Sequence, residues 1–239
     1  GVRVAVVDSG VDYLHADFGG PGDVAGFRKN DPTILEPGTF PTAKVVAGFD
    51  LVGDDYVSGD TPVPDPDPLE CASDAVDHGS AMASAVAGYG VTSTGATYRG
   101  AYAMSFNANA FSLAPGVAPE AELIAVKTFG CGQRVSDRIL DGVEWVLDPN
   151  QDGNFEDRPD VVSLSIGSYP GAFVSVLEEA AQALVTAGIV VVAGNGNSRG
   201  GRGYFAAASP ALAPNLISVG STLNEEVRYE MLQVTGPSG

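Results

Sequence analysis

The chain has 239 residues, 44% of them hydrophobic, which is enough to bury one sizeable core and excludes a disordered protein. Asp and Glu number 30 against 12 Lys and Arg, so the formal net charge of −18 disfavours nucleic acid and anionic membrane surfaces as partners and favours cations. No apolar run reaches the roughly 20 residues of a membrane-spanning helix, and we expect most of the carboxylates only to keep a secreted protein soluble.

The first predicted strand, at 2–7, is an unbroken apolar run that ends in Asp8 and a glycine turn. Such runs are typical of parallel strands covered on both faces, so we expect Asp8 at the carboxyl end of a buried strand, where α/β sheets carry functional groups. A carboxylate that only caps the turn is the alternative. A second apolar run follows at 43–49, and the proline-rich stretch from Gly53 to Leu69 predicts a long surface loop.

Two cysteines, Cys71 and Cys131, lie in loops rich in Gly and Pro. An even pair in loops suggests a disulfide, which would close roughly 60 residues and stabilise the fold by about 4 kcal/mol in an oxidising compartment. Two separate buried thiols are the alternative.

A helical pattern at 78–89 begins with His78 and consists mostly of small residues, which permit a close approach to neighbouring backbone. Histidine titrates near neutrality, so His78 can take a proton from a hydroxyl and return it to a leaving amine. Asp8 would then fix the tautomer of the imidazole and stabilise the imidazolium. The alternative is an ordinary helix start capped by Asp77. His15, the only other histidine, is expected to be a loop residue.

Strand-like runs at 122–128, 161–166, 189–193 and 216–219 alternate with helical patterns at 135–147 and 173–187. This alternation predicts an α/β fold with three layers, α/β/α, and a doubly wound, mostly parallel sheet. In the helix at 135–147, apolar residues recur at steps of three and four and predict one stripe lying on the sheet. The stripe consists of Val135, Ile139, Val143, Val146 and Leu147.

The acidic segment 148–157 has oxygen-bearing side chains at alternate positions, with a glycine after the third, as in the first half of a calcium loop. The predicted calcium ligands are Asp148, Asn150, Asp152 and Asn154. The twelfth position is Pro159, so Glu156, Asp157 or Asp160 would have to complete the shell in place of a bidentate glutamate. A solvated acidic loop is the alternative.

Five motifs, in this order, resemble those of the subtilisin-like serine proteases, the peptidase S8 or subtilase family, and span nearly the whole chain. They are VAVVDSGVD at 4–12, DHGSAMA at 77–83, GVAPEAEL at 116–123, VSLSIG at 162–167 and VVVAGNGNS at 190–198. The resemblance implies a subtilisin-like fold and a secreted serine endopeptidase that hydrolyses peptide bonds with an Asp-His-Ser triad. Secreted members of the family carry similar calcium loops, which supports Ca²⁺ as a structural cofactor.

The resemblance implies roles for further residues. Asn197 becomes the oxyanion donor, a side-chain amide that stabilises charge developing in the transition state, with Asn195 as its rival. The alternative is that both asparagines only form part of a glycine-rich turn. Ser165, Ile166 and Gly167 match the strand that pairs with an extended polypeptide substrate, and a plain core strand competes with this interpretation.

The main departure from the family is that no segment resembles the Gly-Thr-Ser-Met-Ala type motif of the nucleophilic serine, and a lesser one is Ala81, where the family commonly has a second histidine. We expect residues 1–224 to be the N-terminal part of a catalytic domain, and 225–239 to lead toward a protease-associated domain insertion and a serine segment beyond Gly239. This chain would then be inactive alone, with a propeptide and a C-terminal remainder as partners. A non-catalytic relative that binds peptide or calcium is the alternative. A dinucleotide-binding protein that uses the glycine-rich stretch after 189–193 is a remote one.

Overall fold

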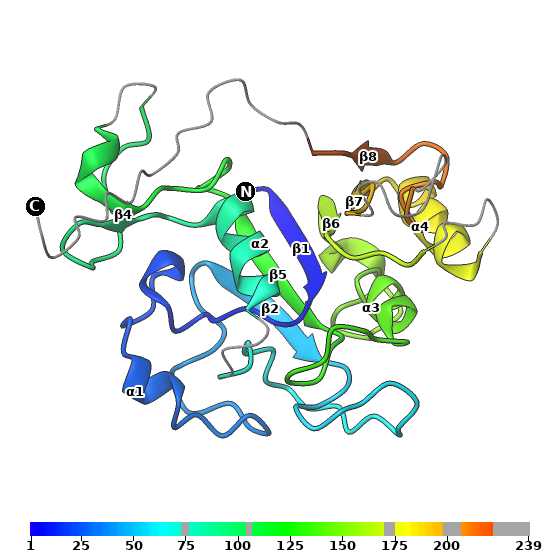
Figure 1. Ribbon diagram of the computed structural model, residues 1–239, viewed down its shortest axis with the longest axis horizontal. Coiled ribbons are helices and arrows are strands. Elements are labelled where there is room, and N and C mark those ends of the chain that lie inside the picture. Colours follow the sequence, from blue (N-terminus) through cyan, green and yellow to red (C-terminus); the bar gives the residue numbers. More distant parts are fainter. Residues whose placement is uncertain (73–76, 104–106, 170–174, 198–206, 222–239) are drawn as a thin grey trace, which may run out of the picture.

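A computed structural model describes residues 1–72, 77–103, 107–169, 175–197 and 207–221 (Figure 1). Its centre is a six-stranded sheet with the order β2-β5-β1-β6-β7-β8, in which every pairing is parallel. The strands are β1 Arg3–Asp8, β2 Val45–Asp50, β5 Glu122–Lys127, β6 Val161–Leu164, β7 Val190–Gly194 and β8 Ile217–Val219. A separate antiparallel pair joins β3 Val91–Thr92 to β4 Phe111–Leu113.

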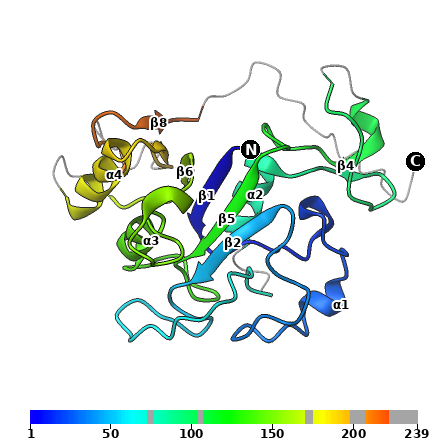
Figure 2. The ribbon, with the colours of Figure 1, turned by 180° about the vertical axis from the view of Figure 1, so that it is seen from behind.

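The helices divide between the two faces of the sheet (Figures 1 and 2). The α-helices are α1 Val24–Phe27, α2 His78–Ala87, α3 Ile139–Trp145 and α4 Val176–Thr186. Short 3₁₀ helices occupy η1 Ala16–Phe18, η2 Ala108–Ala110 and η3 Phe155–Asp157. The predicted three-layer α/β/α architecture is confirmed.

Alternation along β1 explains the two layers, because successive side chains of a strand point to opposite faces of the sheet. Val4 and Val6 pack in one core cluster with the small residues Ala83 and Ala87 of α2. Ala5 and Val7 belong to a second cluster that includes residues of α3 and α4. The predicted reason for the unbroken apolar runs, cover on both faces, therefore holds for β1.

The predicted start of the helix at 135–147 is wrong. The helix α3 begins at Ile139, and Val135, expected in its apolar stripe, lies before it with 70% of its surface exposed. The Ser136 hydroxyl accepts a hydrogen bond from the backbone N–H of Arg138 at 3.0 Å and donates to the carbonyl of Thr128. This local bonding holds a turn ahead of the helix, because serine side chains compete with helical backbone pairing.

The predicted loop from Gly53 to Leu69 is confirmed as irregular structure, since no helix or strand element lies between β2 and α2 in the described part of the chain, but its end is buried rather than on the surface, with Asp67 and Leu69 at most 5% exposed. Its far end returns to the sheet, where Asp65 and Asp50 exchange backbone hydrogen bonds of 2.9 and 3.1 Å. This return brings the end of the loop to the carboxyl end of β2. No helix among the described residues is long and apolar enough to cross a membrane.

Candidate active site

Asp8 ends β1, which lies between β5 and β6 in the middle of the sheet. Its side chain is 2% exposed and accepts a hydrogen bond of 2.8 Å from the backbone N–H of Ser9. The backbone carbonyl of Asp8 accepts from the N–H of Thr128 at 2.9 Å, which fixes the end of β1 against the residue that follows β5. The carboxylate is thus buried, oriented and placed at the edge where a parallel sheet carries its chemistry.

His78 is the first residue of α2, and its imidazole reaches Asp8 across seventy positions of sequence. Its Nδ1 lies 2.8 Å from Oδ1 and 2.9 Å from Oδ2 of Asp8, so Nδ1–H donates to the carboxylate. About half of the imidazole, 48%, is exposed. Hydrogen bonding to Asp8 raises the pKa of His78, although burial opposes this effect. A neutral imidazole held in this way keeps a lone pair on Nε2, the nitrogen available to a reacting hydroxyl.

Gly79 allows the close contact between the start of α2 and the turn after β1. A Cβ atom at this position would lie 2.1 Å from the backbone oxygen and 3.0 Å from the backbone nitrogen of Gly10. The N–H of Gly79 donates to the Ser9 hydroxyl at 2.8 Å. Gly79 therefore permits the close approach of α2 to neighbouring backbone that the small residues of this helix predicted.

The alternative that Asp77 caps the start of α2 is supported by its position but not by its side chain. Asp77 occupies the N-cap position of α2, but its side chain makes no capping hydrogen bond. Ser80 uses its hydroxyl to accept from the backbone N–H of Asp12 at 2.8 Å. His15 caps η1 by accepting the N–H of Asp17 at 3.2 Å, so it is a loop residue as predicted.

The other predicted residues follow β6, which pairs with β1, and β7, the next strand of the sheet. Ser165, Ile166 and Gly167 come directly after β6, and both asparagines come after β7. Because the strands are parallel, these residues lie at the same edge of the sheet as Asp8.

The two asparagines differ in their surroundings. Asn197 is exposed, and its backbone N–H donates to the hydroxyl of Tyr169. Asn195 is half-buried, and its Oδ1 is buried without a hydrogen-bond partner. Gly196 has a φ of 105°, and a Cβ there would lie 1.7 Å from the Tyr169 hydroxyl, so only glycine fits between the two asparagines. Ser198, the last residue of this motif, and most of the glycine-rich stretch considered for dinucleotide binding lie outside the described residues.

The segment after β6 is partly a core segment. Ile166 packs against the cluster that includes α3 and α4, whereas Gly167 is exposed. Ser168 and Ser209 then exchange backbone hydrogen bonds of 3.0 Å in an isolated antiparallel bridge. The competing interpretation of Ile166 as a core residue therefore has support, and Gly167 offers the accessible backbone.

The loop 148–157 folds as a tight turn closed by its own side chains. The Asp148 carboxylate accepts from the N–H groups of Asp152, at 3.1 Å, and Gly153, at 2.9 Å. Asp157 accepts from the N–H of Asn150 at 3.1 Å, and its Oδ1 is buried without a hydrogen-bond partner. Asp148 thus bonds across the turn, and Asp157, one of three candidates for the remaining position, bonds back to it, but the carboxylates of Asp148, Asp152 and Asp157 do not all lie within 4.8 Å of one another.

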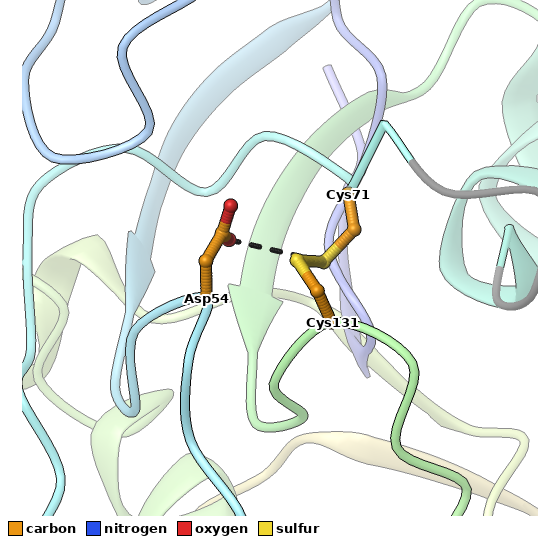
Figure 3. A group of neighbouring side chains, drawn as sticks. All are labelled: Asp54, Cys71 and Cys131. Carbon is orange, nitrogen blue, oxygen red and sulfur yellow. Dashed lines mark hydrogen bonds between the residues drawn. A yellow bond between two sulfur atoms is a disulfide. The ribbon is translucent and has the colours of Figure 1, made fainter.

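Cys71 and Cys131 form the predicted disulfide, with Cα atoms 5.5 Å apart (Figure 3). The carboxylate of Asp54 lies beside the sulfur of Cys71, at 3.8 Å. These three residues are the only group of three or more His, Cys, Asp or Glu ligands within 4.8 Å of one another among the described residues. Sulfurs joined to each other are not thiolates, so we assign no metal to this group.

Glu70 belongs to the site but was not predicted from the sequence. It is 3% exposed, and its Oε2 accepts from the Ser9 hydroxyl at 3.0 Å and from the Ser80 N–H at 3.1 Å. Burial raises the pKa of Glu70 to about 8, and the charge of Asp8 adds to this effect. The available sequence signal was its position just before Cys71, in a segment without periodicity.

Comparison with known proteins gives one family. The family model described as the subtilase family matches residues 1–233. The minor extracellular protease Vpr of Bacillus subtilis (strain 168) is 30% identical over 229 residues, which are 94% of this chain and 21% of that protein. Subtilisin BL of Lederbergia lenta is 38% identical over 109 residues, 45% of this chain and 35% of its own. The chain thus spans about a fifth to a third of these relatives.

Solved structures show the same fold. A protease of Pseudoalteromonas arctica PAMC 21717 has a TM-score of 0.58 at 23% identity, over 91% of this chain and 55% of its own. Fervidolysin of Fervidobacterium pennivorans, described as a keratinolytic enzyme related to subtilisin, has a TM-score of 0.54 at 18% identity, over 91% of this chain and 24% of its own.

Proposed function

The chain belongs to the subtilase family, whose curated relatives here are serine proteases, and we propose that it carries the aspartate and histidine of a serine endopeptidase active on polypeptides. The observation that supports this proposal is the contact of 2.8 Å between His78 Nδ1 and Asp8 Oδ1 at the carboxyl end of β1. The buried carboxylate keeps the imidazole in the tautomer that a general base needs.

In the proposed mechanism His78 acts through Nε2. It takes the proton of a serine hydroxyl as the oxygen attacks the peptide carbonyl, and it later returns the proton to the leaving amine. Asp8 stabilises the imidazolium between these two steps. The proposal requires a serine from another segment of the protein, because none of the 239 residues lies in a motif of the serine type.

Asn197 supplies the oxyanion hole in this proposal. Its side chain follows β7 on the exposed surface, whereas the amide oxygen of Asn195 is buried. Loss of such an amide costs about 3 to 4 kcal/mol of transition-state stabilisation in comparable sites. The backbone of Ser165, Ile166 and Gly167 pairs with the extended substrate, and Gly167 is the exposed member of the three.

We also propose structural calcium in the loop 148–157, with Asp148, Asn150, Asp152 and Asn154 as ligands. Two observations support a fit: the loop curls through φ values of 57° at Gln151 and 80° at Gly153, and the buried Oδ1 of Asp157 has no hydrogen-bond partner. A hard cation prefers several oxygens that converge in one turn. Secretion is a further proposal, because a disulfide persists in oxidising compartments and the relative Vpr is described as extracellular.

The test of the catalytic proposal uses a longer protein that contains the serine segment. A fluorophosphonate probe, which reacts only with an activated serine, should label it, and His78→Ala should abolish labelling. The matched control is His15→Asn, which keeps an acceptor at the N-cap of η1 and should label normally. Equal labelling of the His78→Ala variant would refute the mechanism, and no labelling of the unaltered protein would favour a non-catalytic relative.

A further inference from the structure

Glu70 connects the two elements that carry Asp8 and His78. Through Oε2 it accepts from the hydroxyl of Ser9, the residue after Asp8, and from the N–H of Ser80, in the first turn of α2. The Ser9 hydroxyl also lies 3.3 Å from Oδ1 of Asp8. One serine hydroxyl therefore stands between two carboxyl groups.

We infer that Glu70 is a positioning residue for the Asp8–His78 pair. Glu70 acts through Ser9, and protonation of Glu70 changes the affinity of His78 for a proton. The catalytic meaning of this inference rests on the proposed function. The geometry that supports it does not, since it concerns only contacts within this chain.

The hydrogen-bond arithmetic at Ser9 gives the mechanism. The hydroxyl has one hydrogen to donate, and its oxygen already accepts the N–H of Gly79. When Glu70 is ionised, Ser9 donates to Glu70 and Asp8 loses that donor. When Glu70 is protonated, its own O–H donates to Ser9, and Ser9 donates to Asp8. The proton on Glu70 thus determines whether Asp8 receives a third hydrogen bond, beside those of the Ser9 N–H and of His78.

The charge of Glu70 acts in the same direction. An ionised Glu70 favours the imidazolium form of His78 by direct attraction, and it also leaves Asp8 as a stronger acceptor for the imidazole N–H. Because burial raises the pKa of Glu70 to about 8, both effects begin in the pH range in which a histidine works.

Other charged groups surround this network. Asp8 and Asp77 act on His78 from β1 and from the start of α2. Glu70 also lines a cavity of about 650 Å³ beside α2. The charged or titratable residues that share this cavity are Asp12, His15, Asp17, Arg28 and Asp77. The cavity gives the buried carboxyl group a route for proton exchange.

The test follows the imidazole resonances of this chain by NMR from about pH 5 to about pH 10. The chain has two histidines, so His15→Asn assigns the resonance of His78. In the unaltered chain we expect a second inflection of the His78 resonance where Glu70 ionises. Glu70→Gln should remove this inflection and lower the pKa of His78. The matched control is Glu144→Gln, an exposed residue of α3 on the opposite face of the sheet, which should change neither.

Identical His78 titration curves for the unaltered chain and Glu70→Gln would overturn the inference. Ser9→Ala tests the route, because an undiminished inflection in that variant would exclude transmission through the hydroxyl. If Glu70→Gln does not fold, the unaltered chain alone decides: with ¹³C-labelled glutamate, a His78 resonance that stays constant while Glu70 titrates overturns the inference. None of these measurements needs a nucleophile, so a failure of probe labelling and a failure of this coupling are distinguishable.

Discussion

Removal of the disulfide should destabilise the chain by an amount set by the loop that it closes. Cys71 and Cys131 are 60 positions apart, and the chain-entropy relation for a loop of this length gives about 4 kcal/mol at 25 °C. The bond joins the loop before α2 to the segment after β5. It restricts mainly the unfolded chain, because these two segments are far apart in sequence. In the folded chain the backbone N–H of Cys131 also donates to the carbonyl of Asp54 at 2.7 Å, a contact that needs no sulfur.

The assay is urea unfolding of the oxidised chain and of the Cys71→Ala, Cys131→Ala double variant. We expect a lower free energy of unfolding in the variant, by about 4 kcal/mol, and a larger denaturant slope, because an unbridged unfolded chain exposes more surface. The reduced unaltered chain keeps both sulfur atoms, so its agreement with the variant would assign the loss to the bond itself. A difference below about 1 kcal/mol would refute the reasoning that this bridge mainly restricts the unfolded state.

Three further predictions concern the site, the loop 148–157 and the pH dependence of stability. Gly79→Ala should lower the free energy of unfolding, measured by thermal unfolding, by about 1 to 3 kcal/mol, because the new Cβ meets backbone atoms of Gly10 that no rotamer change can move. Gly220→Ala is the control and should have little effect in the same assay, because the space around Gly220 is open. A chelator should lower the melting temperature of the unaltered chain, and Asp152→Ala should erase the difference between the melting temperatures with and without chelator. Asp60→Ala, which changes an exposed acid of the loop before α2, should preserve this difference. Equal melting temperatures of the unaltered chain with and without the chelator would exclude structural calcium. Because the pKa of Glu70 is raised in the folded chain, the contribution of Glu70 to stability is greatest below its unfolded pKa and is lost as the pH rises toward about 8. The free energy of unfolding measured across this range should therefore depend less on pH in Glu70→Gln than in the unaltered chain. An unchanged pH dependence would contradict the raised pKa.

The pair at the centre of the site was predictable because each member has a local signal. Asp8 follows an unbroken apolar run, and His78 precedes a run of small residues, so their positions at a strand end and a helix start follow from sequence periodicity. The contact between Asp8 and His78 depends on the strand order and on Gly79. The two motifs together suggested this contact, but neither segment determines it alone.

Other features were out of reach of local patterns. Glu70 contacts Ser9 across 61 positions from a segment without periodicity, so nothing in its neighbours predicts its burial. The early helix start at Val135 was wrong because one hydroxyl, that of Ser136, holds a turn that apolar spacing does not report. The β3–β4 pair was not predicted, since its strands are only two and three residues long.

The most direct test of the account measures the proton affinity of His78 with and without the Asp8 carboxylate. In the unaltered chain the NMR titration of His78 should give a pKa above the ordinary value of histidine, and Asp8→Asn, which removes the charge and keeps the size of the side chain, should lower it. The same titration curve for both chains would contradict the claim that Asp8 and His78 work as one acid–base pair.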